Sequence, residues 1–225
     1  MDKRCVILFV KFPEKGKVKS RLAIHLDGDM VLSLYACMVL DAIDTLKNGH
    51  FPFCICFDPP GANGRILSWL GQQYRYMPQL GDNLGERMET AFSRVFSEGI
   101  EEAVLVGCDI PSLTSAIIDD AFRSLKNHDS VIGPASDGGY YLIGFRRSAY
   151  YPPIFRDMSW STSGVFGETV ARLGRSSLSV HILPECMDVD TRDDLVKLLG
   201  RRSDNDAPVS RTLRYLNRIR NSFID

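Results

Sequence analysis

Short, β-branched apolar runs alternate along this chain with longer segments whose apolar residues recur every three or four positions. A run without helical period is typical of a buried strand, and a three-to-four spacing is typical of a helix with one buried face. Alternating strands and helices predict an α/β fold with a mostly parallel central sheet and helices on both faces. Strands are expected at 4–10, 52–57, 74–77, 130–133, 140–145 and 178–183 and in the run that ends at Asp109, and helices at 30–46, 65–70, 84–96, 115–125, 163–173 and 192–199.

One pair of predicted strands departs from the crossover pattern. The runs 130–133 and 140–145 flank Asp137, Gly138 and Gly139. Because Asp-Gly between two strands is a common hairpin signal, we expect one antiparallel excursion in the sheet.

The C-terminal part of the chain is predicted to be separate from the α/β domain. A polar linker begins at residue 201, and residues 209–219 place their apolar side chains on one helical face. We therefore predict one domain over residues 1–200, followed by a linker and an amphipathic helix over residues 201–225. This helix is expected to pack on the domain or on a second subunit of a homodimer, in preference to a membrane surface.

Charge, hydropathy and cysteine usage narrow the classes of partner and compartment. The formal net charge is −1, which gives no electrostatic footprint for nucleic acid. No apolar run is long enough to span a membrane, and the N-terminal apolar stretch lacks the length and cleavage site of a signal peptide. None of the six cysteines forms a C-x-x-C pair and the four histidines are scattered, so neither disulfides nor zinc is expected. These features predict a cytoplasmic protein.

A basic loop follows the first predicted strand. It contains Lys11, Lys19 and Arg21, with Gly16 near its middle, and is expected to lead into a helix near Lys19. Positive charge, a close-approaching backbone and a helix N-terminus suit a phosphate chain. The loop lacks the Walker pattern. The alternative is a solvated basic loop, and the position after strand one favours phosphate binding.

Asp109 is the first candidate for a hard-metal ligand. It follows the buried run 102–106 in Gly-Cys-Asp-Ile-Pro, where Pro111 ends the strand. Ligands of open α/β sheets bind beyond the carboxyl ends of the strands, and a carboxylate there needs a cation to face. We therefore expect Asp109 to bind a divalent metal at a nucleotide phosphate. Its alternative role is to form a turn.

Two glycine-containing segments are further candidates for ligand contact. Gly81 and Arg87 flank the start of a predicted helix, where helix capping alone is an equal alternative. Gly138 and Gly139 would let the backbone approach a ligand and Asp137 projects at the same bend, although a plain hairpin turn has the same sequence.

An acidic segment precedes the last helix of the domain. Thr191 is predicted to cap that helix, with Asp194 three residues later. Only one of Asp188 and Asp190 is expected to face the site formed with Asp109, and we predict that it is Asp190. Trp160 either lines an acceptor pocket or covers the hydrophobic core, and the sequence favours neither role.

Five motifs then occur in a characteristic order: K-x-P-x-x-G-x-V-K-S-R-L, Q-x-G-D-x-L-G-E-R-M, G-C-D-I-P, G-P-A-x-D-G-G-Y-Y-L-I-G and D-V-D-T-x-x-D-L. Together they resemble the nucleotide-diphospho-sugar transferase (GT-A type) superfamily, and within it the bacterial glycosyltransferase-like family linked to radical-SAM/selenodomain gene neighbourhoods. The resemblance covers roughly residues 4–200.

The resemblance implies a Rossmann-like GT-A fold, a nucleotide at the first strand–loop and a divalent metal, Mg²⁺ or Mn²⁺. It assigns Lys11, Lys19 and Arg21 to the nucleotide phosphates and Asp109 to the metal. The chain has no D-x-D, so the second metal ligand is either Asp190 or Asp137.

These observations predict a transferase that moves a sugar from a nucleotide-sugar to a small acceptor. Lys19 and Arg21 would stabilise phosphate charge, and Asp137 would orient or deprotonate the acceptor hydroxyl. The alternative is a nucleotidyltransferase that joins a nucleoside triphosphate to a small phosphorylated metabolite and releases pyrophosphate. The sequence leaves the base, the sugar and the acceptor open.

Overall fold

A seven-stranded sheet forms the centre of the computed structural model, which describes residues 3–200 and 210–223. The strand order is β3-β2-β1-β4-β6-β5-β7, and all neighbours pair in parallel except β6, which is antiparallel to both β4 and β5. The predicted mostly parallel sheet with one antiparallel excursion is confirmed. The strands are β1 (Arg4–Lys11), β2 (Phe53–Asp58), β3 (Arg75–Pro78), β4 (Glu102–Val106), β5 (Ser130–Pro134), β6 (Tyr140–Arg146) and β7 (Val180–Ile182).

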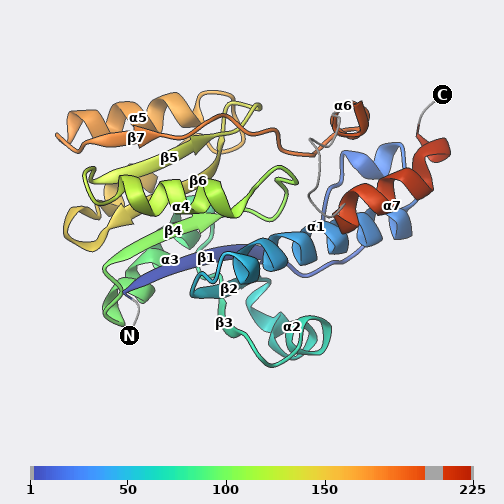
Figure 1. The fold of residues 1–225 in the computed structure, drawn as a ribbon, viewed down its shortest axis with the longest axis horizontal. Coiled ribbons are helices and arrows are strands. Elements are labelled where there is room, and N and C mark those ends of the chain that lie inside the picture. The colour runs from blue at the N-terminus through green and yellow to red at the C-terminus, as the bar shows by residue number, and fades with distance from the viewer. Residues whose placement is uncertain (1–2, 201–209, 224–225) are drawn as a thin grey trace.

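Helices cover both faces of this sheet (Figure 1). Alternate residues of β1 show why: Val6 and Leu8 pack with α1 and α4, whereas Ile7 packs with α3 on the opposite face. The predicted helices on both faces are therefore confirmed. The helices are α1 (Gly28–Asn48), α2 (Asn63–Leu70), α3 (Leu84–Ser97), α4 (Ser115–Ser124), α5 (Val165–Arg175), α6 (Arg192–Gly200) and α7 (Arg211–Ile219).

Each face of the sheet thus carries one apolar cluster. A third apolar cluster lies beside the sheet and joins distant parts of the chain. It contains Leu22 from the basic loop, Val189 from the acidic segment and Leu216 from α7. Asp41 of α1 accepts hydrogen bonds from the backbone N–H groups of Arg211 and Thr212, at 2.9 and 2.8 Å. The helix over 211–219 thus packs on this same chain, next to α1 and α6 (Figure 1). The predicted linker at 201–207 lies outside the described residues.

The helix expected near Lys19 is not there. Lys19 has φ +46°, and only a short 3-10 helix, Leu22–Ile24, follows it. The α-helix begins at Gly28, where Asp27 accepts a hydrogen bond from the Asp29 N–H at 2.8 Å. The basic loop therefore makes a tight turn and offers no α-helix N-terminus to a ligand.

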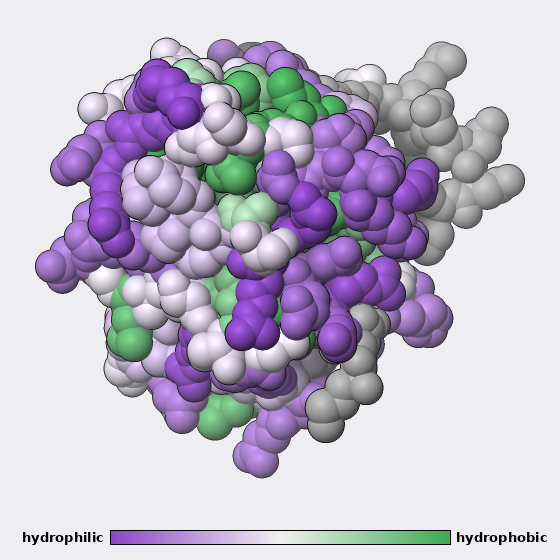
Figure 2. Space-filling model, turned by 90° about the vertical axis from the view of Figure 1, so that its left-hand side faces the viewer, coloured by the Kyte–Doolittle hydropathy of each residue, from purple (hydrophilic) through white to green (hydrophobic). Residues whose placement is uncertain are grey.

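The carboxyl ends of β1, β2 and β4 meet at one edge of the sheet because these strands are parallel. Lys11 ends β1, Asp58 ends β2, and the Asp109 turn follows β4. Figure 2 views another side of the molecule, the one where β1 begins; hydrophilic side chains cover most of that face and the hydrophobic ones form small, separate areas. No helix in the described residues is both long and apolar enough to cross a membrane.

Candidate active site

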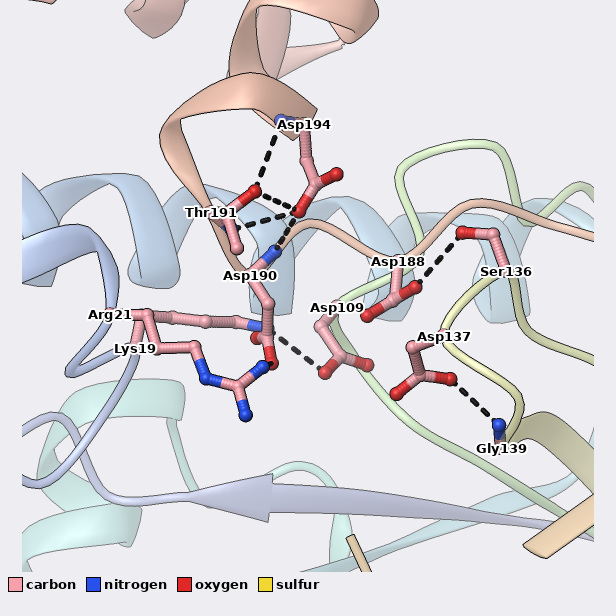
Figure 3. Close-up of polar contacts among 10 residues, drawn as sticks. All are labelled: Lys19, Arg21, Asp109, Ser136, Asp137, Gly139, Asp188, Asp190, Thr191 and Asp194. Atoms are coloured by element: carbon pink, nitrogen blue, oxygen red, sulfur yellow. Dashed lines mark hydrogen bonds and ion pairs between the residues drawn. The ribbon is translucent and has the colours of Figure 1, made fainter. Parts of the chain in front are cut away.

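The Lys19 ammonium lies between two carboxylates at this edge. Its Nζ is 3.0 Å from Asp109 Oδ2 and 2.6 Å from Asp190 Oδ1 (Figure 3). The Lys19 side chain is only 6% exposed, whereas those of Asp109 and Asp190 are 39% and 38% exposed. The basic loop and the Asp109 turn therefore converge, as the sequence predicted, and the acidic segment meets them there.

The pKa values of Lys19 and Asp109 depend on each other's charge. Burial alone would lower the pKa of Lys19, but the charges and hydrogen bonds of Asp109 and Asp190 raise it above its ordinary value. Burial would likewise raise the pKa of Asp109, yet the adjacent ammonium outweighs burial and keeps that pKa below its usual range. Lys19 is thus charged at neutral pH and Asp109 is ionised.

Backbone contacts place Asp109 and Asp190 beside each other. The Val189 N–H donates to the Asp109 carbonyl at 3.1 Å, which joins the two segments directly. After Asp190, the Thr191 hydroxyl and the Asp194 carboxylate form the predicted capping pair: Asp194 Oδ2 accepts from the Thr191 N–H at 2.8 Å, and Thr191 Oγ1 accepts from the Asp194 N–H at 3.4 Å. The start of α6 is therefore fixed, and Asp190 with it.

Asp188 also faces the site, which corrects the expectation that only one of Asp188 and Asp190 would do so. In an extended segment side chains alternate, so residues two apart share a face. Val189 is buried in the third apolar cluster, and both aspartates lie on the other side. Burial and the charges of Asp137, Asp190 and Asp109 raise the pKa of Asp188. Figure 3 shows its carboxylate near those of Asp109 and Asp137.

Two cavities meet at Asp109 and Asp190. The larger, of about 400 Å³, extends along the ends of β1, β2 and β4, and Lys11, Lys19 and Arg87 line it. The smaller, of about 250 Å³, lies between Asp109 and the bend after β5. Its walls include Asp137, Gly139, Asp188, Tyr140 and Trp160. Trp160, left open by the sequence, thus lines a cavity.

Other predicted contacts lie outside both cavities. Arg21 is 68% exposed, and its Nη1 is 4.0 Å from Asp190 Oδ2. Gly81 lines a separate hollow beside α3, and Gly16 has φ +73° in the exposed loop. Gly138 has φ +89°, and a Cβ there would lie 2.3 Å from the carbonyl oxygen of Ser163. Its small size therefore serves packing within the chain, and its approach to a ligand stays a prediction.

Asp137 both forms the turn after β5 and lines the smaller cavity. Its Oδ1 accepts a hydrogen bond from the Gly139 N–H at 2.8 Å, which is the turn-forming alternative. It also lines the smaller cavity. Forming the turn uses one oxygen, so a second oxygen remains directed toward the cavity (Figure 3).

Sequence reasoning missed two polar residues of the larger cavity. Asp58 pairs with Arg87, with 3.2 Å between Oδ1 and Nη1. Gln79 is buried, and its Nε2 donates to the Cys56 carbonyl at 2.9 Å. Both residues follow a predicted strand, Asp58 by one residue and Gln79 by two, and a position at a strand end is the signal that identified Asp109.

The residues present fit a hard divalent cation in chemistry and in charge. Asp109, Asp137, Asp188 and Asp190 line the smaller cavity, and no Lys or Arg does so among the described residues. Lys19 contacts Asp109 and Asp190, and Arg21 lies 4.0 Å from Asp190. The four carboxylates outnumber these two cations, and carboxylate oxygens are ligands that Mg²⁺ and Mn²⁺ accept. Within the described residues no three acidic, His or Cys side chains form a ready-made metal site. The Lys19 ammonium takes the place between Asp109 and Asp190.

Comparisons with known proteins give the family and the fold. Residues 41–162 match a family described as an uncharacterized protein conserved in bacteria (DUF2064). A crystal structure from Desulfovibrio desulfuricans G20, assigned by inference as a nucleotide-diphospho-sugar transferase, is 36% identical with a TM-score of 0.94. The match covers 99% of this chain and 97% of the Desulfovibrio chain. No curated protein matches.

More distant structures share the fold alone. CMP:2-keto-3-deoxy-manno-octonic acid synthetase, complexed with CTP, is 10% identical with a TM-score of 0.55 and covers 88% of this chain and 97% of its own. The 4-diphosphocytidyl-2C-methyl-D-erythritol synthase of Anaerococcus prevotii DSM 20548 is 10% identical with a TM-score of 0.58, covering 89% and 99%. The predicted nucleotide-diphospho-sugar transferase type of fold is confirmed.

Proposed function

We propose, from the premise that this chain belongs to the bacterial DUF2064 family, that it is a metal-dependent glycosyltransferase acting on a nucleotide-sugar and a small acceptor. One observation supports this most directly. Lys19, Asp109 and Asp190 meet where a cation-lined cavity joins an acidic, aromatic one. A bond between a diphosphate and a sugar would be broken at such a junction.

The larger cavity suits the nucleotide. Lys19 brings positive charge to the end near Asp109, where phosphates would lie, and Lys11 and Lys17 also line this cavity. Asp58 and Gln79 offer polar groups at the other end, two and three strands from β4. Adjacent strands are about 4.8 Å apart, so the cavity extends roughly 10–14 Å across the sheet edge. A nucleoside with its diphosphate requires an extended site of this kind.

The smaller cavity favours glycosyl transfer over the nucleotidyl alternative. A phosphorylated co-substrate needs cations, and the described walls of this cavity contain carboxylates and aromatic rings instead. Tyr140 and Trp160 pack edge to face, with ring centroids 6.5 Å apart. Aromatic surface with a few convergent polar groups is typical of small-molecule sites, and here it suits an uncharged sugar or acceptor.

Each residue then has a distinct role in the proposed reaction. Asp109 and Asp190 would hold Mg²⁺ or Mn²⁺, which when bound supplies charge neutralisation for a diphosphate leaving group. Lys19 and Arg21 donate hydrogen bonds to phosphate oxygens. Asp137 orients the acceptor hydroxyl and accepts its proton. The six free cysteines support the cytoplasm as the compartment.

Nucleoside diphosphate release from a panel of nucleotide-sugars, with Mn²⁺ and candidate acceptors, tests the proposal. Asp109→Asn should lower turnover by about 100-fold or more, the usual effect of removing a group that stabilises transition-state charge. Asp119→Asn, an exposed aspartate on α4, is the matched control and should keep full turnover. Full turnover by Asp109→Asn would refute the assignment, and pyrophosphate release from nucleoside triphosphates would establish the nucleotidyl alternative.

A further inference from the structure

Lys19 occupies the space between the two carboxylates that the proposed function assigns to a metal. Its Nζ touches one oxygen of Asp109 and one of Asp190, and its side chain is almost fully buried. Both carboxylates, by contrast, remain more than one-third exposed toward the cavities. The ammonium is therefore an internal counter-ion of the acidic site.

A divalent cation and this ammonium compete for the same oxygens. Both need the lone pairs of Asp109 and Asp190. A divalent cation bound to these oxygens and the ammonium next to them would also repel each other strongly, because the site is partly buried. A cation can bind both carboxylates only after Lys19 leaves them. Arg21 does not replace it, because that guanidinium is largely exposed and lies 4.0 Å from Asp190 Oδ2.

Once displaced, the ammonium needs another anion. An unpaired buried charge is costly, so moving Lys19 away with no new partner is unfavourable. Lys19 also lines the larger cavity, together with Lys11 and Lys17, where nucleotide phosphates would lie. The long, flexible lysine stem lets the ammonium turn from the carboxylates to a diphosphate without a change of fold.

We propose that Lys19 keeps divalent cations out of the site until a nucleotide arrives, so that cation and nucleotide bind with strong mutual enhancement. This inference rests on the proposed function and adds its regulation. The Lys19 ammonium pairs with the diphosphate of the nucleotide. Asp109 and Asp190 are then free to bind the cation. Because coupling between two bound ligands is reciprocal, the factor by which nucleotide improves cation binding equals the factor by which cation improves nucleotide binding.

The test measures Mn²⁺ affinity from the electron paramagnetic resonance signal of free Mn²⁺, with the full chain and no sugar donor. Titrations are made alone and with UDP, GDP, CDP or ADP. For the wild type, at least one nucleotide should improve Mn²⁺ affinity tenfold or more. Lys19→Met removes the internal counter-ion and should bind Mn²⁺ alone at least tenfold more tightly than the wild type, with a smaller nucleotide enhancement.

Lys15→Met is the matched control. It removes one positive charge from the same basic loop, and Lys15 pairs with Asp29, with 2.7 Å between Nζ and Oδ2. Its Mn²⁺ affinity should stay within about threefold of the wild type. Circular dichroism shows whether each variant is folded, and the wild-type titrations alone remain decisive if Lys19→Met does not fold.

Two results would overturn the inference. One is wild-type Mn²⁺ affinity that no nucleotide improves; the other is Lys19→Met affinity for Mn²⁺ no greater than that of the wild type. Glycosyl transfer with either result would leave the proposed function intact and remove only the role of Lys19. Mutual enhancement without turnover of any nucleotide-sugar would support the role of Lys19 and count against the proposed function.

Discussion

At the scale of single residues, the acidic site contains aspartates with opposite environments. Asp109 lies against the Lys19 ammonium, which holds its pKa low. Among the described residues Asp188 has no ammonium or guanidinium partner; its carboxylate accepts a hydrogen bond from the Ser136 hydroxyl at 3.2 Å, and burial and three neighbouring carboxylates raise its pKa. A carboxyl with a raised folded pKa costs folding free energy when it is ionised at neutral pH.

Asp188→Asn should therefore stabilise the metal-free protein at pH 7.5. Asparagine keeps an oxygen for the Ser136 hydroxyl and removes one negative charge from the cluster. The expected gain in the free energy of unfolding is about 0.5 kcal/mol, as for other partly exposed charge pairs. Urea unfolding in EDTA measures it, with Asp119→Asn as the control that should change nothing. A loss of stability in Asp188→Asn would contradict this account.

At the scale of elements, Asp129 joins three strands near the amino ends of β5 and β7. Its Oδ2 accepts from the Ser179 N–H at 2.9 Å and the Ser179 hydroxyl at 2.7 Å, and its Oδ1 pairs with Arg146 at the end of β6. The hydrogen bonds from Ser179, assisted by Arg146, lower the pKa of Asp129. This carboxylate thereby holds the short edge strand β7 against β5.

Asp129→Asn should lower the free energy of unfolding by about 1.5 kcal/mol at neutral pH, the usual value for hydrogen bonds to a charged group. Because the folded pKa is lowered, the stabilisation is present above the unfolded pKa of about 3.9 and is lost as pH falls through the folded value. Urea unfolding from pH 7 to pH 3 should show a constant gap between wild type and variant above about pH 5. The gap should narrow on further acidification, and a gap that stays constant down to pH 3 would contradict this reading.

At the scale of the whole molecule, the C-terminal helix α7 supports both sides of the site. The third apolar cluster brings Leu216 of α7 together with Leu22, next to Arg21, and with Val189, next to Asp190. The Arg192 Nε also donates to the Phe223 carbonyl at 2.6 Å, which connects the start of α6 with the chain beyond α7. The position of Asp190 relative to Lys19 thus depends on a helix that the family match, 41–162, does not include.

Leu216→Ala should destabilise the protein by about 3 kcal/mol and also weaken nucleotide binding in the presence of Mn²⁺. Leu173→Ala is the matched control, because Leu173 is equally buried but belongs to the cluster between α3, α5 and the sheet. The control should lose similar stability and keep nucleotide affinity. Chemical unfolding and calorimetric titration below the transition temperature provide the two readouts, and equal nucleotide affinity in both variants would exclude a role of α7 in the site.

The sequence by itself determined what depends on local periodicity. Apolar spacing gave the order and type of the strands and helices, and strand ends located Asp109. The spacing of Thr191 and Asp194 gave the cap of α6. These features follow from backbone geometry and side-chain alternation within a few residues, so they are readable without a structure.

Only the tertiary structure decided which charges meet. Lys19 contacts Asp109 and Asp190 across 90 and 171 residues of chain, and no local pattern distinguishes it from Lys11 as their partner. The left-handed turn at Lys19, in place of a helix, follows from packing on both sides of it: Val18 lies in one apolar cluster and Leu22 in another. A buried ammonium is stable only where the fold brings carboxylates to it, and that arrangement depends on the path of the entire chain.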